Sequence, residues 1–143
     1  MSAIEKTIIR VFDAFPFLVL VRRQNGWQIV QDTVDNAADH NERHLVSLIN
    51  LGEAYYMLLR EEGEEIAERF LAGVMASAFE IVIPSFEQMK RAGHFKARGG
   101  LSYADAYAAA LAEEHHVPIL TGDPEFKDVE KHGIDIDWLP FNR

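Results

Sequence analysis

The stretch Thr-Ile-Ile-Arg-Val-Phe-Asp, residues 7–13, decides the fold. Its β-branched and apolar residues predict a short buried strand of the kind found in parallel sheets that are covered on both faces. Asp13 stands directly after this strand. A second apolar stretch, residues 117–121, is followed at once by Gly122 and Asp123. Two acids that each follow a buried strand are expected to project from the same carboxyl edge of a parallel sheet.

The rest of the chain alternates predicted helices with predicted strands. Further strands are expected at residues 44–46, 80–83 and 134–139, and helices at residues 16–23 (with Pro16 in the first turn), 27–38, 47–62, 64–78, 85–98, 102–115 and 126–131. This alternation predicts an α/β fold, a three-layer α/β/α sandwich with a mainly parallel central sheet. A length of 143 residues without an internal repeat predicts one domain over residues 1–143.

Composition and charge narrow the class of protein. The chain has no cysteine, which excludes disulfides and thiolate metal sites and favours a reducing cytoplasm. The apolar stretch 11–21 contains Asp13 and Pro16 and is much shorter than the ~20 residues that span a bilayer, so we expect a soluble protein without membrane contact. A net charge of -9 is unusual for a nucleic-acid enzyme, unless the acids gather around divalent cations.

Four acids from distant parts of the sequence fall at positions that a parallel sheet brings together. Asp13 and Asp123 follow strands. Asp105 lies in the first turn of the helix that starts at Ser102, and Glu53 lies early in the helix after the second strand. Because helices leave a parallel sheet at the edge where its strands end, the four carboxylates are expected to converge and to repel one another. We therefore predict a divalent cation there, and carboxylate oxygens suit Mg²⁺ or Mn²⁺.

Each of these acids also has a structural explanation. Ser102 and Asp105 match a capping box. Asp123 lies in a Gly-Asp-Pro sequence that is common in turns, and Asp13 can cap the helix that follows it. Glu53 is harder to explain in this way, because most of its neighbours three and four residues away are apolar. The metal-site hypothesis depends on the common placement of the four acids.

Four short motifs contain these acids in turn: Val-Phe-Asp-Ala-Phe at 11–15, Ile-Asn-Leu-Gly-Glu-Ala-Tyr-Tyr at 49–56, Leu-Ser-Tyr-Ala-Asp-Ala at 101–106 and Leu-Thr-Gly-Asp-Pro-Glu-Phe at 120–126. In order and spacing they resemble the motifs of PIN-domain ribonucleases, most closely the VapC toxins of VapBC toxin–antitoxin pairs. The resemblance covers nearly the whole chain. It implies a PIN-like sandwich that hydrolyses RNA phosphodiester bonds with Mg²⁺ or Mn²⁺, leaving 5′-phosphate and 3′-hydroxyl ends.

The resemblance also implies roles for individual residues. The catalytic residues and metal ligands would be Asp13, Glu53, Asp105 and Asp123. Thr121 is a candidate to hydrogen-bond one of these acids or the substrate phosphate, although a threonine at a strand end can also be purely structural. Glu125 lies where some relatives carry another acid. Phe15 is a departure, because many relatives have a hydroxyl residue or Asn two positions after the first acid.

An acidic ribonuclease still needs a surface that attracts RNA. The candidate is a basic segment in which three residues spaced four apart share a helical face; the segment comprises Lys90, Arg91, His94, Lys96 and Arg98, with Arg22 and Arg23 as a second patch. An ordinary solvated helix face explains the same residues. The expected partners are an RNA substrate, a small antitoxin protein with a basic tail, and a second copy of the chain in a homodimer. A PIN-like nuclease without an antitoxin, acting in RNA processing or on structured DNA, and a catalytically silent binding module remain alternatives.

Overall fold

The structure, a computed structural model, describes residues 6–140. Within these residues, five strands form one sheet in the order β3-β2-β1-β4-β5, and every pairing between neighbours is parallel. The strands are β1 (Thr7–Phe12), β2 (Glu42–Ser47), β3 (Phe79–Val82), β4 (Ile119–Thr121) and β5 (Ile136–Trp138). The predicted parallel sheet is therefore confirmed.

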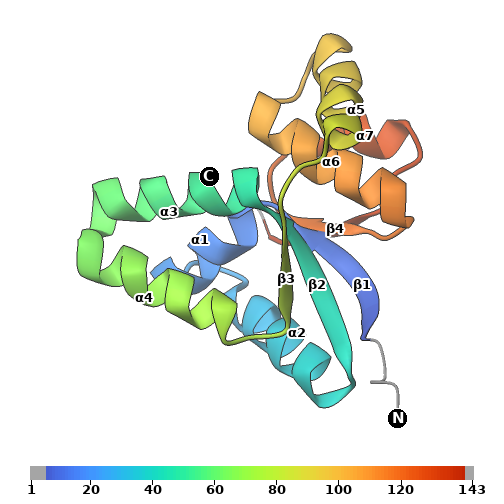
Figure 1. Cartoon of the computed structure of the whole chain (residues 1–143). Coiled ribbons are helices and arrows are strands. Elements are labelled where there is room, and N and C mark those ends of the chain that lie inside the picture. Colours follow the sequence, from blue (N-terminus) through green and yellow to red (C-terminus); the bar gives the residue numbers. More distant parts are fainter. Residues whose placement is uncertain (1–5, 141–143) are drawn as a thin grey trace.

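Seven helices in the described part of the chain cover the two faces of the sheet (Figure 1). One face carries α5 (Phe86–Ala97), α6 (Tyr103–His115) and α7 (Phe126–Lys131). The other face carries α1 (Ala14–Arg22), α2 (Trp27–Asp39), α3 (Leu48–Glu62) and α4 (Glu64–Met75). This is the predicted three-layer α/β/α sandwich. Across residues 6–140, none of the helices combines the length and apolar character needed to cross a membrane.

Consecutive apolar residues of the central strands serve both layers. Val11 and Ile119 pack into the core beneath α5, α6 and α7, whereas Phe12 and Leu120 pack into the core beneath the other four helices. Successive side chains of a strand point to opposite faces, so a strand buried on both faces needs an uninterrupted apolar run. This explains why Val11 and Phe12, the last two residues of β1, are both apolar.

The bounds of the elements differ from the predicted ones by a few residues, for local reasons. The first helix begins at Ala14, two residues before Pro16, with Asp13 as its N-cap and Pro16 in its first turn, as predicted. β4 begins two residues later than predicted, because Pro118 has no N–H to donate to a neighbouring strand. The carbonyl oxygen of Pro118 still accepts a hydrogen bond from the Val11 N–H at 2.9 Å.

The order of the strands places the first and the fourth side by side. From β1 the chain moves outward through β2 to β3, then returns to the other side of β1 to form β4 and β5. Such a reversal leaves a crevice beyond the carboxyl ends of the two central strands, where α/β proteins bind their ligands. The register pairs Phe12 with Leu120, so the residues that follow, Asp13 and Thr121, lie at the mouth of this crevice.

A candidate active site of clustered carboxylates

A cleft of about 310 Å³ opens at the crevice between β1 and β4. Five acids line it, together with Ser102 and several apolar side chains of α1 and α3; the acids are Asp13, Glu53, Asp105, Asp123 and Glu125. The structure thus brings the four predicted acids into one cleft and adds Glu125, which sequence reasoning left open. We call this feature the acid cleft.

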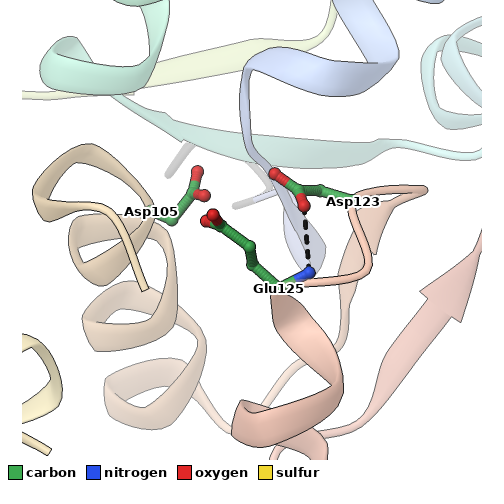
Figure 2. A group of neighbouring side chains, drawn as sticks. All are labelled: Asp105, Asp123 and Glu125. Atoms are coloured by element: carbon green, nitrogen blue, oxygen red, sulfur yellow. Dashed lines mark hydrogen bonds between the residues drawn. The ribbon is translucent and has the colours of Figure 1, made fainter. Parts of the chain in front are cut away.

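The carboxylates of Asp105, Asp123 and Glu125 form the tightest group in the acid cleft (Figure 2). One oxygen of each lies within 4.8 Å of the others. Asp105 comes from the first turn of α6, whereas the other two precede α7. The backbone N–H of Glu125 donates to Asp123 Oδ1 at 3.0 Å, which fixes the turn between these two residues. Figure 2 shows the three carboxylates turned toward one another from two separate segments.

Asp13 is buried in the acid cleft, with 2% of its surface exposed. Its Oδ1 accepts a hydrogen bond from the Phe15 N–H at 3.3 Å, so it caps α1, as the sequence allowed. Its Oδ2 accepts from the hydroxyl of Thr121 at 2.9 Å. The same hydroxyl accepts from the Asp123 N–H at 3.1 Å. Thr121 therefore connects the first acid of the cleft to the backbone of the fourth.

Phe15 occupies the position where many relatives have a hydroxyl residue, and here its ring packs against Gly122. A Cβ atom at position 122 would lie 2.5 Å from Phe15 Cε1 and 3.2 Å from the carbonyl oxygen of Leu139. Any residue larger than glycine would displace the ring. The hydroxyl that holds Asp13 comes from Thr121 instead, so the departure at position 15 leaves the first acid with a hydrogen-bonding partner.

Two helices position the remaining predicted acids. Ser102 caps α6, and its hydroxyl accepts from the Asp105 N–H at 3.2 Å, which is one half of the predicted capping box. Glu53 is half-buried on α3. Asn50, fully buried one turn before Glu53, donates through Nδ2 to the carbonyl oxygen of Ala104 at 2.9 Å. This bond joins the two helices that carry Glu53 and Asp105, and no feature of the sequence had singled out Asn50.

Burial and mutual repulsion raise the pKa values of three acids in the cleft. Burial, followed by the charges of Asp123 and Glu53, raises the pKa of Asp105 from 3.8 to about 8. Burial and the charge of Asp105 hold the pKa of Asp13 well above its usual range, against the hydrogen bond from Thr121. Burial and the charges of Asp123 and Glu125 raise the pKa of Glu53. No lysine or arginine within residues 6–140 forms an ion pair with these acids.

The composition of the tight group fits a hard divalent cation. It offers only carboxylate oxygens, which are the ligands that Mg²⁺ and Mn²⁺ prefer. In octahedral coordination at about 2.1 Å, ligand oxygens lie roughly 3–4 Å apart, slightly closer than the 4.8 Å limit within which these three oxygens lie. Small side-chain movements therefore suffice to form a site. Within the described residues it is the only group of three or more potential ligands.

The predicted basic segment is divided between ion pairs and open surface. Lys90 and Arg91 form ion pairs with acids of α5 and α6 at 3.8 and 3.0 Å. His94 lines a shallow hollow on the outer side of α5. Arg98, directly after α5, lines a groove next to the acid cleft. Of these residues, Arg98 is the one that lines the groove beside the acid cleft.

The model of the PIN domain matches residues 11–132. This chain belongs to the PIN domain family. The matched part includes every acid of the cleft, and the predicted PIN-like fold is confirmed. A comparison with curated protein sequences gives no significant match.

Solved structures share the fold of this PIN domain at low sequence identity. A chain of VapBC2 from Rickettsia felis, bound to a DNA fragment from its promoter, has a TM-score of 0.71 and 17% identity, with 92% of this chain and 99% of that chain covered. VapC20 from Mycobacterium tuberculosis, a toxin that cleaves the sarcin–ricin loop, has a TM-score of 0.69 and 16% identity, covering 94% and 100%. VapBC-1 from nontypeable Haemophilus influenzae has a TM-score of 0.68 and 17% identity, covering 91% and 97%.

Proposed function

We propose that this chain is a metal-dependent endoribonuclease. The observation that carries the proposal is the group formed by the carboxylates of Asp105, Asp123 and Glu125 in a cleft that also contains Asp13 and Glu53. A group of acids without a basic partner needs a cation, and Mg²⁺ or Mn²⁺ fits its ligands. Membership of the PIN family and the similar fold of an RNA-cleaving toxin support RNA as the substrate.

The residues of the cleft would have different roles in binding the cation and in catalysis. The cation would be held by Asp13, Glu53, Asp105 and Asp123, with Glu125 as a further ligand. When bound, the cation stabilises the negative charge that grows on the phosphate and lowers the pKa of water. Glu53 is half-buried with a raised pKa and can accept or release a proton at the mouth of the cleft. Thr121 holds Asp13 in a fixed orientation.

The activity is tested with purified protein and a short single-stranded oligoribonucleotide. We expect cleavage in Mn²⁺ or Mg²⁺ that EDTA stops, and a downstream fragment that mass spectrometry identifies by its 5′-phosphate. Asp105→Asn should abolish cleavage, whereas Glu64→Gln, at an exposed position of α4, should not change it. Cleavage that persists in EDTA or in the Asp105→Asn protein would contradict the proposal.

We further infer that the chain is the toxin of a toxin–antitoxin pair. Several structures with a similar fold are VapBC toxin–antitoxin assemblies. An acid cleft attracts a basic group, and an arginine from the tail of a small antitoxin can pair with two carboxylate oxygens at once. Such a tail would compete with the cation for the cleft.

The regulatory proposal is tested by titrating an arginine-containing tail peptide against protein variants. Asp123→Asn should weaken binding, whereas Glu64→Gln should not. Equal affinities would place any inhibition outside the acid cleft.

Expression of the chain alone in bacteria should arrest growth, and Asp13→Asn should remove this effect. Cleavage without growth arrest would favour a processing nuclease, and RNA binding without cleavage would favour a silent module.

We also propose that residues 1–143 form one domain that acts in the cytoplasm as a homodimer. Support for the homodimer comes from Ile83 and Phe86, which follow the edge strand β3 and are 75% and 77% exposed. Large apolar side chains at such exposure are typical of protein–protein contacts. Light scattering should give the mass of a dimer for the wild type and of a monomer for Phe86→Asp. A monomeric wild type would contradict the proposal.

A further inference from the structure

A second groove, of about 450 Å³, lies beside the acid cleft. The turn after α5 forms one side of it and α7 forms the other; the lining residues are Arg98, Gly99, Gly100, Pro124, Glu125, Lys127, Asp128 and Lys131. Glu125 lines both the groove and the acid cleft, so the two are neighbours along the surface. We call this feature the basic groove.

The three cations of the basic groove differ from most other cations of the molecule. Within residues 6–140, Arg98, Lys127 and Lys131 form no ion pair, whereas carboxylates engage many of the others, in the pairs Arg10–Asp137, Arg22–Glu61, Arg43–Glu80, Arg69–Glu65 and Arg91–Glu113. The guanidinium of Arg98 lies over the ring of Phe95, 5.0 Å from its centroid. This stacking leaves the donors of Arg98 free for a ligand.

Two acids also line the basic groove, but neither pairs with its cations. Glu125 belongs to the carboxylate group of the acid cleft, where a cation would balance its charge. Asp128 lies beside Gly100, where an added Cβ would be 3.3 Å from Asp128 Oδ2. The groove therefore has three cations against one acid that is outside the cluster. In a chain with a net charge of -9, this local excess of positive charge indicates a surface for an anionic ligand.

We propose that the basic groove binds the phosphate backbone of the RNA strand next to the bond that is cut. The inference rests on the proposed function, because the adjacent acid cleft supplies the site of cutting. Lysine side chains neutralise phosphates without reading bases. Gly99 has no neighbouring atom within 4 Å of an added Cβ, so the wall formed by the turn is open to a bulky strand. Arg98 belongs to the RNA-binding set predicted from the sequence, whereas Lys127 and Lys131 do not.

Binding, measured by fluorescence anisotropy with a labelled single-stranded oligoribonucleotide, tests this proposal independently of cleavage. The Asp105→Asn protein is the background, so that the probe stays intact. The test variant adds Lys127→Gln and Lys131→Gln, at exposed positions of α7. The control adds Arg60→Gln and Arg69→Gln, which cause the same change in net charge at residues that form ion pairs.

We expect the test variant to bind roughly tenfold or more weakly near 0.1 M salt, because each lost phosphate contact lowers the slope of log K against log salt by about 0.7. The control should retain at least most of the affinity and the slope. Equal losses in the two variants would show that only net charge matters and would overturn the proposal, as would an unchanged affinity of the test variant. If the protein binds RNA through this groove but never cuts it, the proposed nuclease activity would be refuted, whereas the proposed RNA-binding role of the groove would stand.

Discussion

The carboxylates of the acid cleft and those of the outer helices have opposite electrostatic surroundings. On the outer surface, Glu65 and Glu113 each lie beside an arginine; Glu65 is largely exposed and Glu113 about half-exposed. In the cleft, Asp13 and Asp105 are 2% and 5% exposed and face other acids. A surface carboxylate is solvated by water, whereas a buried one needs a charge partner. The fold thus retains buried acids that weaken it, and a cation-binding role explains why.

The largest effect that distinguishes the two regions should be on catalysis. Asp105 and Glu113 lie on the same helix, α6, so they form a matched pair. Asp105→Asn keeps the shape of the side chain but removes a negative ligand, and we expect the rate of RNA cleavage to fall by roughly 10³-fold or more. Glu113→Gln should leave the rate unchanged. Initial rates of RNA cleavage in Mn²⁺ measure both effects. Similar rates for the two variants would mean that the acids of the cleft matter no more for catalysis than those of the outer surface.

A smaller effect is expected from the hydroxyl that connects Asp13 with Asp123. Thr121→Val retains the volume of the side chain but removes both hydrogen bonds of the hydroxyl. Removing a group that orients a metal ligand typically costs about 10–100-fold in metal affinity or activity. Thr121→Ser should restore most of this loss, which a purely steric role of the threonine would not predict. The readouts are Mn²⁺ affinity and the cleavage rate, with circular dichroism as a control for folding.

The stability of the metal-free protein should depend on pH because of the cleft. The pKa of Asp105 is about 8 in the folded protein and 3.8 in the unfolded chain, so the folded state binds the proton more tightly. Stability from this group is therefore highest near pH 4, falls as pH rises toward 8, and is constant above that. Asp105→Asn should flatten this dependence and stabilise the protein by about 1–2 kcal/mol at pH 8. Urea denaturation in EDTA measures the free energy of unfolding as a function of pH. If the stability of the variant fell more steeply with rising pH than that of the wild type, the raised pKa of Asp105 would be contradicted.

The smallest effect should come from breaking an ion pair of the outer helices. Arg91 and Glu113 are about half-exposed and lie 3.0 Å apart. Surface pairs of this kind contribute about 0–1 kcal/mol, so Glu113→Gln should shift the free energy of unfolding by less than about 1 kcal/mol. The same urea experiment measures this shift. A loss of several kcal/mol would mean that the surface acids, too, are essential to the fold.

Local patterns were sufficient to predict most elements and the common edge of the acids. The predicted helices 47–62, 85–98 and 102–115 each start at a serine, and Ser47, Ser85 and Ser102 all accept a hydrogen bond from an N–H group in the first turn of the helix that follows. Asp13 and Asp123 were expected to share an edge because all strands of a parallel sheet end on the same side. That argument needs no knowledge of which strands are neighbours.

The finer geometry of the site depends on contacts that local patterns do not contain. The bond between Thr121 and Asp13 requires β4 to lie beside β1, and nothing in either strand identifies its neighbour. The position of Glu125 depends on the turn that precedes α7. Lys127 and Lys131 lie in no basic run, so the sequence directed attention to α5 instead.

The central claim, that the acid cleft binds a divalent cation, is tested most directly by titration calorimetry with Mn²⁺. We expect the wild type to bind Mn²⁺ at millimolar concentration or below. At pH 7 it should release protons, detected by repeating the titration in buffers with different ionisation heats, because the raised pKa of Asp105 leaves protons to displace. Asp105→Asn should reduce both binding and proton release. No binding of Mn²⁺ at millimolar concentration, or binding that is identical in the variant, would contradict the account.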